Sequence, residues 1–163
     1  MHKQEDFDRQ ADLLLPRVYN KKDGYLYYPV FSELGITWEA EEYDITDHEH
    51  MLSLRDVFMW RFDTSTDETS MYFNYDLDRY TGAIDCNGVK VYENDIIEDG
   101  IRRQFVIKYS EYHLKYRLDP YNDKAKKSFT SDVEAMDWFL SKDDKGNSSG
   151  IKVIGNIHKQ DEE

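Results

Sequence analysis

Cysteine is almost absent from the sequence, which contains only Cys86. A single thiol excludes an internal disulfide and any zinc site built from several cysteines, and this composition suits a reducing cytoplasm. The neighbours of the thiol, Asp85 and Asn87, supply neither a base nor the electropositive surroundings that activate a nucleophilic cysteine. We therefore expect Cys86 to be chemically inert.

Long apolar runs are missing as well. A membrane-spanning helix needs about 20 predominantly apolar residues, and no stretch of this chain approaches that length. The first residues, Met1 to Asp6, are mostly charged or polar, and no apolar signal core follows them. The sequence therefore predicts a cytoplasmic protein with no membrane partner.

Basic residues are few compared with acidic ones: 21 Lys and Arg against 34 Asp and Glu give a net charge of −13. This charge repels phosphates, so direct nucleic-acid binding is disfavoured. The compact basic patch of Lys124, Lys126 and Lys127 is too small for a nucleic-acid footprint. The acidic surface either keeps the protein soluble or, alternatively, mimics nucleic acid and occupies a host DNA-binding protein.

Aromatic residues are abundant, with 13 Tyr, 8 Phe and 3 Trp in 163 residues. Such rings favour strands and bury large areas, which indicates a folded, β-rich chain. Tyrosine-rich faces also occur at protein interfaces, and Tyr25, Tyr27 and Tyr28 are close together in the sequence. The composition thus favours a β protein that acts through contacts with other proteins.

Two hairpins are predicted in the first half of the chain. The first lies within residues 13–30, where the polar turn Asn20–Gly24 separates two extended segments. The second joins residues 57–62 to residues 70–77, whose apolar side chains alternate with period two. Three further elements are expected here: a short helix within 4–14, a strand over 36–45 and a helical turn over 47–55.

The second half contains the clearest local signals. Asn87-Gly88 predicts a two-residue type I′ turn between strands 80–84 and 89–92, and Asn94 is suited to a left-handed conformation. Ser131 and Glu134 form a capping box that starts a helix, with Val133, Met136, Phe139 and Leu140 on one face. The remaining predicted strands are the paired segments 103–110 and 112–118 and a closing strand over 151–158.

These residues resemble the YopX protein family of temperate phages and related mobile elements. The motif positions that match are Tyr80, Thr81, Gly82, Asp85, Asn87, Gly88, Tyr92, Glu93, Asp95 and Ile96, followed by Val153, Ile154, Gly155, Asn156 and Ile157. Arg17 to Asn20 is similar to the family's N-terminal segment. Three positions depart from the family pattern: Asn94 replaces glycine, Cys86 replaces a common lysine and His158 replaces the final tyrosine.

The resemblance implies a mainly β fold, α+β at most, made of antiparallel hairpins with a barrel-like (SH3-like) C-terminal part. One short amphipathic helix is expected near residues 132–141. Residues 8–160 would form a single unit of this family, built as one lobe or as two lobes over 8–77 and 78–160. The family brings no established reaction with it, so the motif residues are expected to shape the backbone.

Two clusters of residues are candidates for metal binding or catalysis. Asp47-His48-Glu49-His50 contains potential metal ligands, and the alternative is a polar segment in which Asp47 caps a helix. Glu93 and Asp95, together with Asp85 and the Glu98-Asp99 pair, could serve acid–base catalysis. The alternative, which we favour, is that Asp85 accepts backbone amides in an Asx-turn and that Asp95 does the same for the chain entering Ile96-Ile97.

We therefore expect no enzymatic activity, no cofactor, no metal and no catalytic residue. The expected function is that of a phage or mobile-element accessory protein in the host bacterial cytoplasm, which binds an unknown protein partner or forms a homo-oligomer. A small hydrolase or metal-dependent enzyme using the carboxylates or His48 and His50 is the alternative. The residues to which we assign a structural role are Arg17, Tyr80, Thr81, Gly82, Asp85, Asn87, Gly88, Tyr92, Glu93, Asn94, Asp95, Gly155 and Asn156.

Overall fold

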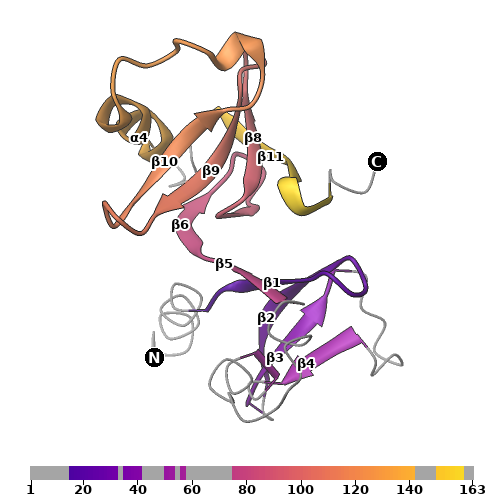
Figure 1. Cartoon of the computed structure of the whole chain (residues 1–163). Helices are drawn as coiled ribbons and strands as arrows, with labels where there is room; N and C mark the ends of the chain where they lie inside the picture. The colour runs from indigo at the N-terminus through magenta and orange to yellow at the C-terminus, as the bar shows by residue number, and fades with distance from the viewer. Residues whose placement is uncertain are drawn as a thin grey trace, which may run out of the picture. The chain divides into compact units, whose positions relative to one another are not determined.

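The structure is a computed structural model that describes residues 15–32, 35–41, 50–53, 56–57, 75–141 and 150–159. The chain divides into two compact units, residues 1–79 and residues 80–163. Antiparallel strands are the main regular element in the described part of both units, and the prediction of a mainly β protein is confirmed (Figure 1). Among the described residues, no helix is long and apolar enough to cross a membrane.

The first unit contains a five-stranded antiparallel sheet in the order β4-β3-β2-β1-β5. Its strands are β1 (Arg17–Asn20), β2 (Tyr25–Ser32), β3 (Gly35–Ala40), β4 (Met51–Ser53) and β5 (Tyr75–Asp78). The buried core of this unit is formed by Val18, Tyr27, Trp38, Ala40, Leu52 and Val57. The large aromatic side chains in that core agree with the strand-favouring composition.

The predicted first hairpin is confirmed as the β1–β2 pair, with Val18 opposite Tyr27. Asn20 and Asp23 build the turn: the Asn20 carboxamide oxygen accepts from the Lys22 amide, and the Asp23 carboxylate accepts from the Tyr25 amide. The Tyr27 hydroxyl donates to Asp23 at 2.6 Å. Burial and the contact with Asp23 raise the pKa of Tyr27, so the phenol stays a donor at neutral pH.

Several predictions for the first unit need correction. Met51–Ser53 form strand β4, so the predicted helical turn over 47–55 is wrong there. Val57 has a helical backbone, although the sequence predicts a strand over 57–62. Strand β5, which the predicted second hairpin would pair with that strand, pairs with β1. Local sequence patterns do not reveal such pairing between residues about 60 positions apart. The segments 4–14, 42–49 and 58–74, which include other predicted elements, lie outside the described residues.

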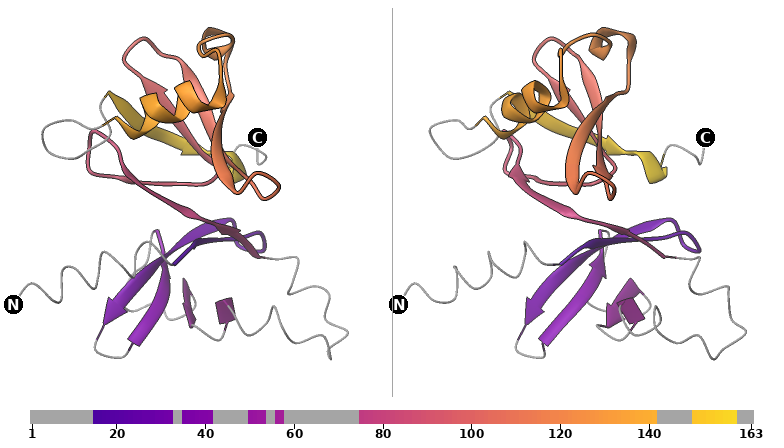
Figure 2. Two further views of the ribbon diagram at one scale, coloured as in Figure 1. Left: turned by 90° about the vertical axis from the view of Figure 1, so that its left-hand side faces the viewer. Right: turned by 60° about the vertical axis from the view of Figure 1, so that its left-hand side comes forward.

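The second unit has a four-stranded antiparallel sheet, β10-β9-β8-β11, and a separate β6–β7 hairpin. The strands are β6 (Tyr80–Ile84), β7 (Lys90–Tyr92), β8 (Asp95–Asp99), β9 (Gln104–Ser110), β10 (Lys115–Pro120) and β11 (Ile151–Asn156). The helices are η3 (Asp123–Ala125), α4 (Asp132–Leu140) and η4 (Ile157–Lys159). The described strands form an open sheet that does not close into a barrel (Figure 2).

Helix α4 packs on the sheet through a face that matches the predicted one only in part: Phe139 and Met136 face the core as predicted, whereas Val133 and Leu140 do not. Ala135 and Phe139 are buried in the core with Phe105 and Ile107. Val133, which the prediction placed on the apolar face, is 66% exposed, and Leu140 is also exposed. The Ser131 hydroxyl caps the helix as expected by accepting the Glu134 amide, but the Glu134 carboxylate accepts from Thr130 instead of Ser131.

The turn at Asn87-Gly88 is longer than predicted. The Gly88 amide donates to the Asp85 carbonyl and the Asp85 amide donates to the Val89 carbonyl, which encloses a three-residue loop, Cys86–Gly88. Gly88 has a φ of +81°, whereas Asn87 has a negative φ, so the predicted type I′ turn is wrong. The pairing of β9 with β10 is confirmed, and β11 ends at Asn156 instead of His158.

The loop between β8 and β9 repeats this design with different residues. The Arg102 amide donates to the Asp99 carbonyl, the Asp99 amide donates to the Arg103 carbonyl, and the Asp99 carboxylate accepts from the amides of Ile101 and Arg103. The position that Gly88 holds in the first loop is held here by Arg102, with a φ of +64°. A side chain at positive φ is strained, because the Cβ atom crowds the backbone.

Exchanging the residue types at these two positions should therefore change stability in opposite directions. Arg102→Gly is expected to stabilise the fold by about 0.5–1 kcal/mol, and Gly88→Ala to destabilise it by about 1 kcal/mol, although space for a Cβ exists at Gly88. Urea unfolding of both variants measures the two changes. Destabilisation by Arg102→Gly would show that the arginine side chain stabilises the loop more than its backbone strain destabilises it.

Candidate functional site

Asp85 is a buried carboxylate that holds three backbone amides. One oxygen accepts from the amides of Asn87 and Val89, each at 2.8 Å, and the other accepts from the amide of Val153 at 2.9 Å. The Cys86 amide also donates to the Ile151 carbonyl. The predicted Asx-turn is present, and the contact with Val153 joins the loop to strand β11, 68 residues later.

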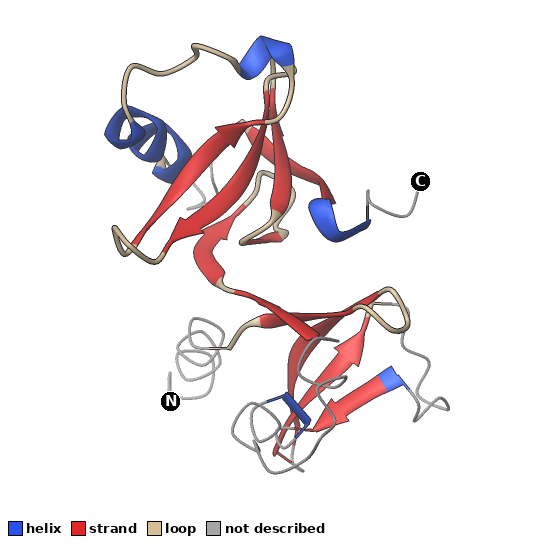
Figure 3. Cartoon of the chain, in the orientation of Figure 1, coloured by secondary structure: helices blue, strands red, loops and turns tan. Residues whose placement is uncertain are grey.

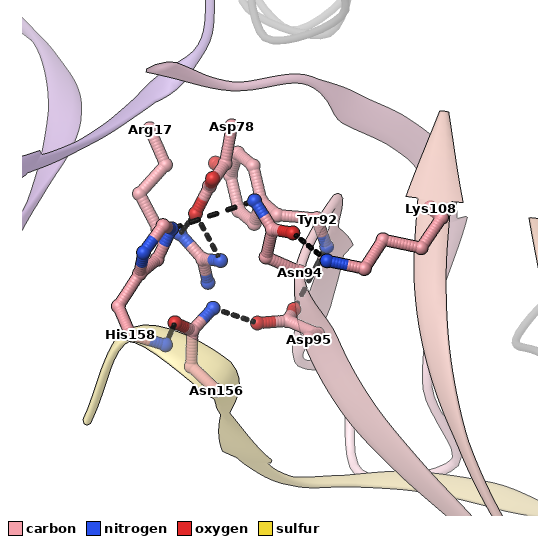
Figure 4. Close-up of polar contacts among 8 residues, drawn as sticks. All are labelled: Arg17, Asp78, Tyr92, Asn94, Asp95, Lys108, Asn156 and His158. Carbon is pink, nitrogen blue, oxygen red and sulfur yellow. Dashed lines mark hydrogen bonds and ion pairs between the residues drawn. The ribbon is translucent and has the colours of Figure 1, made fainter. Parts of the chain in front are cut away.

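Asp95 performs a similar task at the turn between β7 and β8. Its carboxylate accepts from the Tyr92 amide at 2.8 Å and from the Asn156 side-chain amide at 3.1 Å (Figure 4). The Asn156 side-chain oxygen in turn accepts from the His158 amide. Asp95 therefore bonds to the strand before it, whereas the prediction had it cap the strand that it enters.

Asn94 has the positive φ that the sequence predicts, +69°. Its amide donates to the Ile107 carbonyl and its carbonyl accepts from the Ile157 amide. The side chain adds contacts that a glycine could not make: its oxygen accepts from Lys108 Nζ at 2.9 Å, and its nitrogen lies 3.4 Å from His158 Nε2 (Figure 4). Asn94 and His158, two of the three departures from the family pattern, thus contact each other.

The β6–β7 hairpin contains four further motif residues. The Thr81 hydroxyl donates to the Val91 carbonyl at 2.6 Å, and the rings of Tyr80 and Tyr92 pack at a centroid distance of 5.3 Å. Gly82 has a φ of +81° in the segment where the β6–β7 register shifts. Gly155 lies where the β11–β8 register shifts. Gly82 and Gly155 therefore lie at irregularities in strand pairing, where glycine is commonly found.

Arg17 forms a buried ion pair in the first unit. Its Nε and Nη2 atoms donate to one carboxylate oxygen of Asp78 at 3.1 and 2.7 Å, and the two side chains are 2% and 0% exposed (Figure 4). The residues are Cα partners in the β1–β5 register. The sequence does not predict Asp78 as this partner, because nothing in the local pattern indicates which acid will lie opposite Arg17.

The other residues considered for chemistry do not gather in the part of the chain that the structure describes. Cys86 is exposed at the tip of its loop. His50 packs edge-on against Tyr25 at 4.9 Å, while Asp47, His48 and Glu49 lie outside the described residues. Within the described ranges, no three His, Cys, Asp or Glu side chains are placed to hold a metal ion.

The Glu98-Asp99 pair has electrostatics unlike those of a general acid. The side-chain hydrogen bond from Gln104 lowers the pKa of Glu98. Burial alone would raise the pKa of Asp99, but hydrogen bonds from the backbone and guanidinium of Arg103 and from the Ile101 amide outweigh it and lower that pKa. A general acid at neutral pH needs a raised pKa. Both groups are therefore ionised at neutral pH and suited to structural roles.

Two features of the described surface present apolar groups to solvent. One is the loop between β9 and β10, where Tyr112 and Leu114 are 91% and 77% exposed. The other is a pocket of about 250 Å³ between the end of the β9–β10 pair and the start of α4. Phe105, Leu118 and Ala135 form part of its apolar lining, and Lys127 is on its polar side.

Comparisons with known proteins place the chain within one family. A family model described as YopX protein matches residues 17–162, which include described residues of both units. The chain is also similar to the crystal structure of protein EF1440 from Enterococcus faecalis, at 18% identity and a TM-score of 0.43 over 91% of this chain and 95% of that one. A comparison with curated proteins gave no match.

The role of Asp85 as an amide acceptor can be tested by removing its charge. Asp85→Asn places a carboxamide nitrogen or a weaker acceptor against three backbone amides, and we expect a loss of about 2–4 kcal/mol in the free energy of unfolding. Asp137→Asn, at an exposed helix position, is the matched control and should change stability by less than about 0.5 kcal/mol. Equal stabilities of the two variants would contradict this role.

The lowered pKa of Asp99 predicts a contribution to acid sensitivity. A group whose folded-state pKa is depressed stabilises the fold above its unfolded pKa of about 3.9, and this stability is lost as pH falls through the folded value. Asp99→Asn should therefore lower stability at pH 7 and make stability fall less steeply below about pH 4. Urea unfolding at a series of pH values measures both effects, and an unchanged acid slope would count against the assignment.

Proposed function

The chain belongs to the YopX protein family, and from that premise we propose that it is a non-enzymatic accessory protein of a phage or other mobile element. It acts in the host bacterial cytoplasm as a protein-binding or self-assembling module. Its binding element is the exposed loop between β9 and β10, which we call the hairpin tip, Glu111–Leu114.

The observation that carries this proposal is the exposure of two large apolar side chains on a strained loop. Tyr112 and Leu114 face solvent, and Leu114 has a φ of +51°, a conformation that favours glycine or asparagine. Ser110 holds the loop in shape, because its hydroxyl accepts from the His113 amide. Strain of about 1–3 kcal/mol persists where function requires it, and an ordered, exposed tyrosine is a typical interface anchor.

The way the motif uses its acids supports a binding role over a catalytic one. Asp85 and Asp95 are buried, and their oxygens accept hydrogen bonds from backbone amides and from Asn156. A carboxylate in that environment is engaged by the protein's own donors and is shielded from a substrate. The motif therefore builds the second unit, and the exposed surface is left to recognise partners.

The proposal is tested by removing the hairpin tip's apolar side chains and following partner capture. Wild-type protein immobilised at one site is incubated with lysate of the host bacterium, and bound proteins are identified by mass spectrometry. We expect the double variant Tyr112→Ala/Leu114→Ala to lose the captured protein, by at least about tenfold, without loss of thermal stability, since both side chains are exposed.

The matched control is Ile101→Ala, which removes a 66% exposed apolar side chain from the β8–β9 loop. This variant should capture the same protein as the wild type. Capture that survives the loss of both tip side chains would overturn the proposal, as would a hydrolytic or metal-dependent activity that depends on the motif carboxylates.

A further inference from the structure

The pocket beside α4 is suited to a single side chain. Its volume of about 250 Å³ lies below the range of roughly 300–1,000 Å³ that is typical of small-molecule sites. Phe105, Leu118 and Ala135 supply apolar surface, and the hydroxyls of Ser128 and Ser131 lie among the lining residues. Apolar walls with hydroxyl groups nearby match an aromatic side chain that has a polar end, which is the chemistry of tyrosine.

The polar side of the pocket carries positive charge on an otherwise acidic chain. Lys127 lines the pocket, is exposed and has a φ of +61°. In the described part of the chain it makes no hydrogen bond or ion pair through its side chain, whereas the neighbouring Lys126 pairs with Asp123. Asp132, the acid among the lining residues, is paired with Lys115 at 3.6 Å. An acidic group next to the inserted ring would therefore meet an uncompensated lysine.

The hairpin tip has this combination of groups. Glu111 directly precedes Tyr112, and both residues are exposed. The ring of Tyr112 packs edge-on against His113 at 4.9 Å, a contact that favours this orientation of the aromatic side chain. An ordered aromatic anchor loses little conformational freedom when it is buried.

The hairpin tip does not occupy the pocket of its own unit, because Tyr112 is 91% exposed and is not among the lining residues. The pocket is lined at the Phe105–Pro120 end of the β9–β10 pair and by Asp132, which pairs with Lys115, whereas the tip follows the pair Ser110 and Lys115 at the other end of the same strands. Five residue steps along a strand separate the two ends by about 17 Å. Figure 3 shows the tip loop and η3 at opposite ends of β9 and β10. In this structure the pocket is therefore open to the tip of a different copy.

We propose that the pocket receives Tyr112 of a second copy of this chain, with Glu111 of that copy beside Lys127. This inference rests on the proposed function, because it uses the same hairpin tip and identifies its partner. The two surfaces in contact are different, so the contact is head-to-tail and continues into a ring or a longer chain of copies. The net charge of −13 on every copy opposes the contact at long range, and salt screens that repulsion.

Sedimentation velocity of the full chain at about 0.15 M salt, from about 10 µM to about 1 mM, measures the association. The wild type is expected to gain mass with concentration. Tyr112→Ala and Lys127→Glu should each weaken association by at least about tenfold. Ser128→Phe, which fills the pocket, should also weaken association. If Ser128→Phe fails to fold, Lys127→Glu still tests the pocket. Ile101→Ala is the control and should associate like the wild type.

Mixing two variants separates a specific contact from general loss of association. Tyr112→Ala has an intact pocket, and Lys127→Glu has an intact tip, so an equimolar mixture should form dimers that grow no further. A mixture that stays monomeric while the wild type associates would overturn the assignment of tip to pocket. Association of the wild type that is unaffected by either substitution would overturn it as well.

Different results would contradict the tip-to-pocket contact and the proposed function. A wild type that stays monomeric at about 1 mM overturns the second copy as the occupant. If tip-dependent capture from lysate persists in that case, the tip binds another protein and the proposed function stands. If neither self-association nor capture depends on the hairpin tip, both proposals are wrong.

Discussion

The second unit depends on the Asp85 carboxylate, which holds three backbone amides from two distant parts of the chain. It closes the Cys86–Gly88 loop through Asn87 and Val89, and it attaches strand β11 to that loop through Val153. Because Asp85 is fully buried, its charge would be costly without these donors. The same contacts that offset this cost also determine where the last strand lies, next to β8 on one side and the loop on the other.

Carboxylate-to-amide contacts recur at several turns of the described chain. Asp99 repeats the geometry of Asp85 between β8 and β9, and Asp95 joins the β7–β8 turn to Asn156. Charged acceptors make stronger hydrogen bonds with amides than neutral ones do. Several of the 34 acidic residues therefore stabilise turns within the fold, so the high acidity is not only a surface property.

The motif acids are engaged by the backbone, and the proposed recognition of partners uses the exposed surface of the second unit. The hairpin tip and the pocket beside α4 lie at opposite ends of the same two strands, and each has a feature that the fold does not require. In the tip it is an exposed apolar pair with Leu114 at positive φ, and in the pocket it is Lys127 at positive φ. Both features fit a protein that binds other protein surfaces, including those of its own copies.

The sequence alone was sufficient for the mainly β class, the β1–β2 and β9–β10 hairpins, the Ser131 cap and the positive φ of Asn94, because each depends on neighbouring residues. Tertiary contacts decided the rest. Val133 turned outward and Ala135 inward because the sheet selects which face of α4 is buried, and Arg17 met Asp78 only through the pairing of β1 with β5. The pocket, too, is formed by segments from β9, β10 and α4, and no local pattern records how such segments come together.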